Sequence, residues 1–302
     1  MSESSSAARR TAALAPDVLA ALLIVWIVWG STYLAIKIGV QSVPPFALTA
    51  ARFLLAGVVL FVIARWRREA LPSAAQWRSA AIVGAFTMGG GVGLTSVAEQ
   101  TNSSSLTTII VASGSLANLL AAGLILRDWP RRREWAGIVV ALAGTVLLAF
   151  DGEVRAAPFA ALVQMAAIGC WAIGSALSRK LSLAPGAMGN ASQMLAGGLA
   201  VAVLSVVRGE SVPAVVPTSA IGAWLYLALI GSVLAYSAYM HLVRSVSPAL
   251  ATSYSYVNPL VAMALGFLVL DERLSPAAFG AVALIVLGVV MISRARSRER
   301  AA

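Results

Sequence analysis

The sequence is poor in the residues that build metal and redox centres, with one cysteine, Cys170, and one histidine, His241. A single cysteine excludes an intramolecular disulfide, and the pair cannot supply a zinc or iron–sulfur cluster. The sequence also has no Gly-x-x-x-x-Gly-Lys-Ser/Thr phosphate loop, so ATP hydrolysis by that route is excluded. We therefore expect no cofactor, no metal and no enzymatic activity. An enzyme would need a nucleophile–base pair or a metal cluster, and one cysteine and one histidine far apart in the sequence do not supply it.

Charged residues are also scarce, at 11% of the chain, against 60% hydrophobic residues and a mean hydropathy of +0.87. A soluble fold could not bury this much apolar surface. Apolar runs of about 20 residues match the thickness of a bilayer, in which the backbone must form helices or a closed barrel, and barrel strands are half as long. The sequence predicts an all-α integral membrane protein with ten transmembrane helices, at about 18–38, 45–64, 77–98, 104–126, 134–150, 158–180, 187–207, 219–243, 248–270 and 276–293.

The segment Leu106–Leu126 and its connection Arg127-Asp128 reappear about 144 residues later as Leu250–Leu270 and Asp271-Glu272. The first connection continues into a basic loop and the second does not. Because basic loops stay in the cytoplasm, the two halves should lie in the bilayer with opposite orientation, as in many secondary transporters. We expect a first five-helix repeat at 18–150 and a second at 158–293.

Lysine and arginine determine the predicted orientation. If the N-terminus is cytoplasmic, the connections on the opposite side of the membrane contain only Arg155, Arg208 and Arg273. Both termini, the tail 1–17 and the basic tail 294–302, are therefore predicted to be cytoplasmic. The polar start of the chain has no obvious cleavage site for a signal peptide. The cytoplasmic side collects Arg9, Arg10, Arg65, Arg67, Arg68, Arg78, Arg127, Arg131, Arg132, Arg133, Arg179, Lys180, Arg244, Arg294, Arg296, Arg298 and Arg300.

The net charge of +10 has the same explanation. In a soluble protein it would indicate nucleic acid as a partner, whereas here the charges are scattered over loops that face the membrane surface. We expect the lipid bilayer as a partner and no nucleic acid. The sequence leaves the oligomeric state open, with a monomer among the options.

Both halves carry short motifs that together resemble a known family. Trp29-Gly30-Ser31, Lys37, Pro45 and Arg52-Phe53 occur near the start of the first half. Asn258-Pro259 and Asp271-Glu272-Arg273-Leu274, followed by Gly280 and Gly288, occur near the end of the second. In order and spacing, these motifs resemble the ten-helix EamA-type exporters of the drug/metabolite transporter (DMT) superfamily. The resemblance implies two interleaved inverted repeats around a central cavity and transport by alternating access.

The expected function is therefore secondary transport of small metabolites across the cytoplasmic membrane, with export implied by the resemblance alone. No aspartate or glutamate lies in the middle of a predicted span, which argues against a dedicated exporter of lipophilic cations. Neutral, zwitterionic or weakly anionic solutes are favoured, with amino acids as the leading class. The alternative is a membrane partner or assembly protein of the same fold that transports nothing. Substrate, direction and ion coupling are not decided by the sequence.

Matching interruptions in two repeats are a sequence indicator of a transporter site. The 144-residue interval superposes Gly114-Ser115 on Asn258-Pro259, each near the middle of its span. Proline lacks an amide hydrogen and crowds the carbonyl four residues before it, which leaves backbone polar groups available. We predict Gly114 and Pro259 as hinges; the alternative is a kink that serves only packing.

Polar and aromatic residues at helical spacing indicate which helix faces look inward. Tryptophan and tyrosine form rigid apolar walls with one polar atom, which suits a small amphipathic solute, although such rings also serve as core packing or interfacial anchors. The predicted substrate-binding residues are Trp29, Ser31, Tyr33, Ser115, Asn118, Trp171, Ser175, Tyr236, Tyr239, Tyr256 and Asn258.

Placing an ionisable side chain within a membrane span is energetically unfavourable, so such residues are functional candidates by default. Lys37, Arg52, Glu99 and His241 are the candidates for charge or proton coupling. Each also has a structural interpretation: Lys37 can reach the interface, Arg52 can bind nearby carbonyls or pair with an acid, and His241 can be solvated. Glu99 is the acid near a span end that could pair with Lys37 or Arg52.

Overall fold

The computed structural model describes residues 15–112, 114–129, 132–148, 150, 155, 157–245, 254–272 and 275–300. The regular secondary structure of this part of the chain is entirely helical and includes no strand, which confirms the predicted all-α class. Its elements are α1 (Pro16–Val40), α2 (Pro45–Trp66), α3 (Ala74–Gly84), η1 (Ala85–Gly93), α4 (Leu94–Ala98), α5 (Ser104–Ala112), α6 (Gly114–Leu126), α7 (Arg132–Leu148), α9 (Pro158–Lys180), α10 (Gly186–Val207), α11 (Thr218–Leu225), η2 (Tyr226–Leu234), α12 (Ala235–Ser245), α14 (Tyr254–Leu270) and α15 (Pro276–Arg300).

Six helices in the described ranges are long and apolar enough to cross a membrane, or seven if α5 and α6 form one bent span. The same ranges contain three shorter apolar helices, Trp135–Gly144, Val257–Leu270 and Pro276–Gly288. The length and composition of these helices establish a multi-pass membrane protein. The predicted start of the ninth span, 248–253, and most of both tails lie outside the described residues.

Proline begins several of these helices. It is the first helical residue of α1, α2, α9 and α15, where its missing N–H would have no partner within the helix and its fixed φ suits the first turn. The start of α3 instead carries a capping box, in which Gln76 N–H donates to Ser73 Oγ (3.3 Å) and Ser73 N–H donates to Gln76 Oε1 (2.8 Å).

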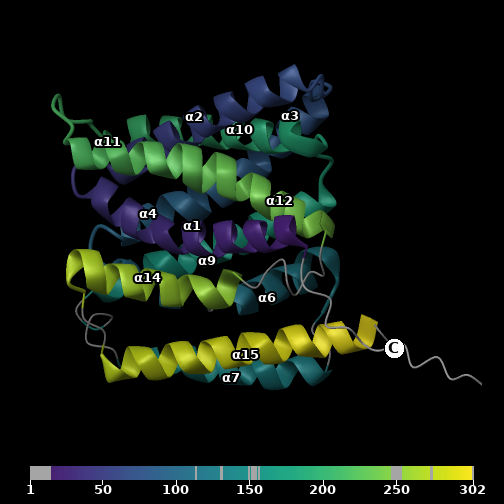
Figure 1. Cartoon of the computed structure of the whole chain (residues 1–302), viewed down its shortest axis with the longest axis vertical. Helices are drawn as coiled ribbons and strands as arrows, with labels where there is room; N and C mark the ends of the chain where they lie inside the picture. The colour runs from purple at the N-terminus through teal and green to yellow at the C-terminus, as the bar shows by residue number, and fades with distance from the viewer. Residues whose placement is uncertain are drawn as a thin grey trace, which may run out of the picture.

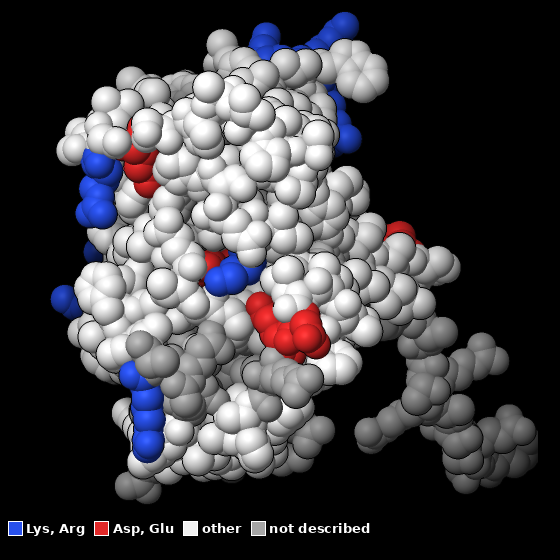
Figure 2. All heavy atoms as spheres, turned by 90° about the vertical axis from the view of Figure 1, so that its left-hand side faces the viewer, with Lys and Arg blue, Asp and Glu red and all other residues white. Residues whose placement is uncertain are grey.

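The helices lie side by side across Figure 1, with α2 and α10 near the top and the pair α7 and α15 at the bottom. We call the left-hand end of the bundle, where α1 and α14 end, the Gln41 end, after the residue that follows α1. The opposite end, where α1 begins, is the Asp17 end. Figure 2 looks onto the Gln41 end, where the visible surface is mostly uncharged and acidic and basic atoms lie together near its middle.

A glycine of α2 packs against a leucine of α10, and the equivalent glycine of α10 packs against the equivalent leucine of α2. A Cβ on Gly57 would lie 2.9 Å from Leu195 N, and a Cβ on Gly198 would lie 3.1 Å from Leu54 N. Gly198 follows Gly57 by 141 residues, and Leu195 follows Leu54 by the same interval. The two helices therefore approach each other through equivalent glycine positions.

The pair α7 and α15 repeats this arrangement. A Cβ on Gly144 would lie 2.9 Å from Ile285 N, and one on Gly288 would lie 2.5 Å from Ala141 N. Here the interval between equivalent residues is 144, the value read from the sequence. The change from 141 to 144 places three extra residues in the second half, between its members of the two helix pairs.

Each end of the bundle has a glutamate that caps a helix from the other half. Glu69 Oε2 accepts a hydrogen bond from Met188 N–H at the start of α10 (2.8 Å). Glu210 Oε2 accepts one from Ala47 N–H at the start of α2 (2.8 Å). A carboxylate there satisfies free amides and complements the positive end of the helix dipole. Both the glutamates and their partners are again 141 residues apart.

Two π-helical segments, η1 and η2, also occupy equivalent positions, because Tyr226 follows Ala85 and Leu234 follows Gly93 by 141 residues. The glycine run in η1 packs tightly against its neighbours: a Cβ on Gly90 would lie 2.5 Å from Cys170 Cβ. Close packing between helices therefore accounts for this glycine. The π-helical conformation of the run was not predicted.

The two predicted helix interruptions differ in this structure. In the first half, Ser104–Ala112 and Leu116–Leu126 are bent by 44° relative to each other. By contrast, α14 runs from Tyr254 to Leu270 through Pro259. The hinge role of Gly114 and Pro259 therefore stays a prediction.

Candidate functional site

The segment η2 receives side chains from two other helices near the middle of the bundle. Trp29 Nε1–H of α1 donates to the carbonyl oxygen of Gly231 at 3.1 Å. A π-helix changes the pairing of backbone carbonyls within a helix, and such segments are frequent at functional sites. The indole is thereby fixed against a backbone group 202 positions away in sequence.

Arg52 of α2 contacts Ser232, the residue of η2 that follows Gly231. Its Nε–H donates to Ser232 Oγ at 2.9 Å, and Ser232 in turn donates to the carbonyl of Leu227 at 2.9 Å. The guanidinium lies 5.0 Å from the centroid of the Phe53 ring. Its Nη2 lies 3.4 Å from the point where a Cβ on Gly231 would stand. The absence of a side chain at Gly231 therefore allows the guanidinium to approach η2 closely, and Arg52 is 7% exposed.

A third contact joins α1 to the start of η2. The hydroxyls of Ser31 and Tyr226 lie 2.6 Å apart, and Ser31 Oγ also donates to the carbonyl of Val28 (2.8 Å). Thr32, the next residue, donates to the carbonyl of Trp29 (2.6 Å). Trp29 and Ser31 of α1, both predicted as substrate-binding residues, therefore contact η2.

Four rings meet on the side of this site toward the Asp17 end, and we call them the aromatic cluster: Trp29, Tyr236, Tyr239 and Tyr254. The ring centroids of Trp29 lie 5.1 Å from those of Tyr239 and 4.8 Å from those of Tyr254, the latter edge-on. Tyr239 is 6.2 Å from Tyr236 and 5.8 Å from Tyr254. These separations are favourable for aromatic pairs. The cluster joins α1, α12 and α14.

The contact between α1 and α14 depends on a glycine and an amide. A Cβ on Gly30 would lie 2.6 Å from Val261 Cβ, so a larger residue could not fit without moving α14. Asn258 is buried, and its Nδ2 lies 3.1 Å from the carbonyl of Tyr254 and 3.3 Å from that of Trp26 when the amide is oriented to donate. Asn258 thus links the two helices directly.

The structure brings together only part of the predicted substrate-binding set. Trp29, Ser31, Tyr236, Tyr239 and Asn258 gather around η2 and α14, and Tyr33 lies within electrostatic reach of Arg52.

The rest of that set lies on α6, α9 and α14. Trp171 is 38% exposed and packs beside Gly91 of η1. Asn118 is exposed, and its Nδ2–H donates to the carbonyl oxygen of Gly114 in the same helix (3.0 Å). Ser178 Oγ donates to the carbonyl oxygen of Ser175 at 2.8 Å. The side chains of Ser115 and Tyr256 lie outside the described part.

The two predicted charges at the Gln41 end do not form a simple ion pair. Lys37 Nζ donates to the carbonyl oxygens of Glu99 and Asn102, each at 2.8 Å. Neither carboxylate oxygen of Glu99 has a hydrogen-bond partner among the described residues, although the side chain is completely buried. Lys37 therefore holds the backbone after α4 and does not occupy the carboxylate.

His241 lies at the Asp17 end, and its Nε2 is 3.1 Å from Asp17 Oδ2. Both side chains are largely accessible, at 43% and 65%. The contact joins the start of α1 to α12. His241 is therefore an exposed contact between helix ends, two residues after Tyr239 of the aromatic cluster on α12.

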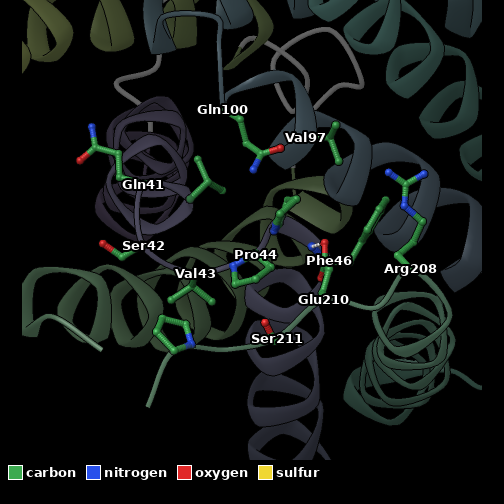
Figure 3. Close-up of a pocket in the computed structure, with 13 residues that line it drawn as sticks. Gln41, Ser42, Val43, Pro44, Phe46, Val97, Gln100, Arg208, Glu210 and Ser211 are labelled. Atoms are coloured by element: carbon green, nitrogen blue, oxygen red, sulfur yellow. Dashed lines mark hydrogen bonds between the residues drawn. The ribbon is translucent and has the colours of Figure 1, made fainter. Parts of the chain in front are cut away.

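A pocket of about 510 Å³ opens at the Gln41 end. In Figure 3, Gln41 and Arg208 stand on opposite sides of it, with Gln100 above and Ser211 below. None of the predicted site residues lines it. The pocket reaches Val97 and Gln100, the neighbours of the buried Glu99 in sequence.

Several residues of the site were missed from the sequence. Tyr226 and Tyr254 carry the same signal as the tyrosines that were named, and Tyr254 lies one helical turn before Asn258. Gly231 and Asp17 carry no comparable signal. Gly231 contributes a backbone carbonyl, and Asp17 contributes only because two helix ends lie close together.

Comparison with known proteins shows similarity along nearly the whole chain. The model described as the EamA-like transporter family matches residues 18–150 and again 158–294. The uncharacterized inner membrane transporter YedA of Escherichia coli strain K12 is 39% identical over 274 residues, which cover 90% of this chain and 89% of YedA. A probable terminal-alkyne amino-acid exporter of Streptantibioticus cattleyicolor is 26% identical over 277 residues, covering 91% and 92%.

A solved crystal structure shares the fold. It matches with a TM-score of 0.63 at 23% sequence identity, and the match covers 91% of this chain and 95% of that one.

Proposed function

The chain belongs to the EamA-like transporter family of the DMT superfamily, and from this premise we propose that it exports small amphipathic metabolites by alternating access. It is a multi-pass membrane transporter and not an enzyme. The name of YedA supports placement in the inner membrane. The name of the amino-acid exporter supports export and a substrate of that class.

We propose ten membrane spans in two inverted repeats, at 18–150 and 158–293. The two separate matches of the family model support this division. The equivalent glycine contacts, glutamate caps and π-helical segments support a common architecture of the halves. The basic loops then place the Asp17 end and both termini in the cytoplasm.

Labelling of engineered cysteines tests this topology. In a Cys170→Ser background, Ala70→Cys should react with an impermeant thiol reagent only after the cytoplasmic face is opened, because residue 70 is exposed at the Asp17 end. Ser211→Cys, exposed at the Gln41 end, should react in intact cells. Both residues reacting from the same side would contradict the inverted arrangement.

The observation that carries the proposed site is the convergence of Trp29 and Arg52 on Gly231 and Ser232 of η2. The indole supplies an apolar wall and the guanidinium a fixed positive charge. Arg52 uses Nε–H on Ser232, and a guanidinium has four further N–H donors. Such an arrangement suits a carboxylate-bearing amphipathic solute, since arginine binds carboxylates in a planar, two-bond geometry.

Movement between two open states requires contacts that can separate at each end. The exposed Asp17–His241 pair and the aromatic cluster close the Asp17 side between α1 and α12. The pocket opens toward the Gln41 end. We propose that the helices rock about Gly114 and Pro259, so that these two sides open alternately.

Flux measurements test the proposed function. Purified protein in liposomes should exchange at least one member of a labelled panel of amino acids, purines and sugars. Trp29→Phe keeps the ring and removes the hydrogen bond to Gly231, which is worth about 0.5–1.5 kcal/mol, so we expect a roughly three- to tenfold lower rate.

The matched control is Trp66→Phe, because Trp66 is 85% exposed and should leave the rate unchanged. Equal rates for wild type and Trp29→Phe would remove Trp29 from the site. No exchange of any panel member by folded, inserted protein would favour a role as a membrane partner or assembly protein.

A further inference from the structure

Glu99 is an acid that the proposed site does not use. Its side chain is 0% exposed, and neither carboxylate oxygen has a hydrogen-bond partner among the described residues. A buried ionised carboxylate without partners is strongly unfavourable, so such a group is either neutral or charged only while a neighbouring cation compensates it. Glu99 can therefore exist in two states whose balance depends on its surroundings.

The charged and titratable groups around Glu99 are few. Lys37 and Tyr33 approach from α1, Arg52 from α2 and Glu272 from the connection after α14. The α5 segment Ser104–Ala112 has no titratable side chain, and neither has α9 between residues 158 and 169. Two cations and one other acid thus determine whether the carboxylate tolerates its charge.

The position of Glu99 in its helix favours the neutral form. It follows Ala98, the last residue of α4, where the helix dipole presents its negative end. Lys37 opposes this effect by its charge, but its hydrogen bonds go to the carbonyls of Glu99 and Asn102. A proton can therefore bind to or leave the carboxylate without breaking the Lys37 contacts.

Other buried polar atoms at the Gln41 end also lack a partner among the described residues: the side-chain amide of Asn102, the hydroxyl of Thr107 and Oε1 of Gln164. Gln164 Nε2–H donates to Thr95 Oγ1 (3.2 Å), one helical turn before Glu99. The pocket wall includes Val97 and Gln100 on either side of Glu99. Glu99 therefore lies in the chain between two residues of the pocket wall, at the same end of the bundle as these polar atoms.

We propose that Glu99 is the site of a coupled proton, which moves with the carboxylate group of the substrate bound at Arg52. The proposal rests on the function proposed above. A proton from the solution at the Gln41 end forms an O–H bond with one Glu99 oxygen, and the residue becomes neutral. Arg52 then loses a nearby negative charge and binds the substrate carboxylate more strongly. Release of the substrate returns the proton to the solution on the side that is then open.

The coupling is reciprocal, since a ligand that binds more tightly to the protonated state must raise the affinity for the proton by the same factor. Export is then driven by the gradient of the solute itself, and an acidic solution at the Gln41 end opposes it. The same acidic solution should drive accumulation of the solute in the reverse direction.

The test uses the carboxylate-bearing solute that the panel identifies, with full-length protein in liposomes. Wild type should exchange this solute across the membrane and accumulate it from an acidic solution. Glu99→Gln mimics the neutral acid, so exchange should continue within about twofold while accumulation driven by the pH gradient falls to the level of empty liposomes. Asp271→Asn is the matched control: Asp271 is an exposed acid, and its φ of 53° suits asparagine. It should retain both activities.

A second measurement does not depend on the variant folding. Addition of the solute to wild type in weakly buffered detergent solution should take up a proton, measured with a pH electrode, and Asp271→Asn should do the same. Absence of uptake would overturn the proposal.

The transport outcomes separate two failures. If wild type exchanges no solute, the proposed function fails. If it exchanges solute but the pH gradient drives no accumulation, if a sodium gradient drives it instead, or if Glu99→Gln accumulates as wild type does, the assignment of Glu99 is wrong. Loss of exchange in a folded Glu99→Gln protein would also overturn it, because a coupling group is not needed for exchange.

Discussion

Replacement of Gly84 by alanine should destabilise the folded protein by about 2 kcal/mol, within the range for overpacked interiors. At this position a Cβ would lie 2.6 Å from the carbonyl oxygen of Gln193 and 2.8 Å from Gly197 Cα. Both neighbours are backbone atoms of α10, so relief requires α3 and α10 to separate. We expect a thermal unfolding midpoint in detergent that is roughly 5 °C below that of wild type.

The control is Gly169→Ala in α9, because nothing lies within 4 Å of a Cβ at that position. Alanine favours the helix over glycine by up to about 1 kcal/mol, so this variant should be as stable as wild type or slightly more stable. Equal midpoints for the two variants would show that α3 and α10 are not held as close as described.

Replacement of Arg52 by methionine should lower exchange of a carboxylate-bearing solute by roughly tenfold to a hundredfold, since a hydrogen bond to a charged group contributes about 1.5–3 kcal/mol. The same change should leave the unfolding midpoint equal or higher. Arg52 is 7% exposed, and removing a buried charge in favour of an apolar side chain of similar length relieves its desolvation. Exchange and thermal unfolding, measured on one preparation, distinguish the two roles of the residue.

Arg65→Met is the matched control, with the same chemical change on the same helix at an exposed position. Its exchange rate should equal that of wild type. A lower unfolding midpoint for Arg52→Met with an unchanged exchange rate per folded molecule would assign Arg52 to structure and remove it from substrate binding.

The sequence was sufficient for the features that depend on composition and local pattern. Apolar length predicted the helices, and the motifs around Trp29 and Asn258 indicated the family to which the chain belongs. It also predicted that Trp29 and Tyr239 belong to one region, because both lie on polar faces of their helices. Their ring centroids are 5.1 Å apart.

Features that depend on the mutual rotation of helices could not be read in this way. The partners of Trp29 and Arg52 lie 202 and 180 positions away in the sequence, on a π-helical segment that no residue pattern predicts. Trp171 was predicted as a substrate-binding residue from its place on a helix face, and its ring packs beside Gly91 of η1. Helical spacing fixes the face on which a side chain lies, and it does not fix which neighbour the side chain contacts.

The exchange of glutamate caps between the halves has a consequence for biosynthesis. The amide of Ala47 is satisfied by Glu210, which the ribosome adds 163 residues later, and Glu69 finds Met188 only after a further 119 residues. The first half therefore enters the bilayer with an incomplete helix start and an unused acid. Its insertion must tolerate this until the second half emerges, so assembly is completed late, by the whole polypeptide.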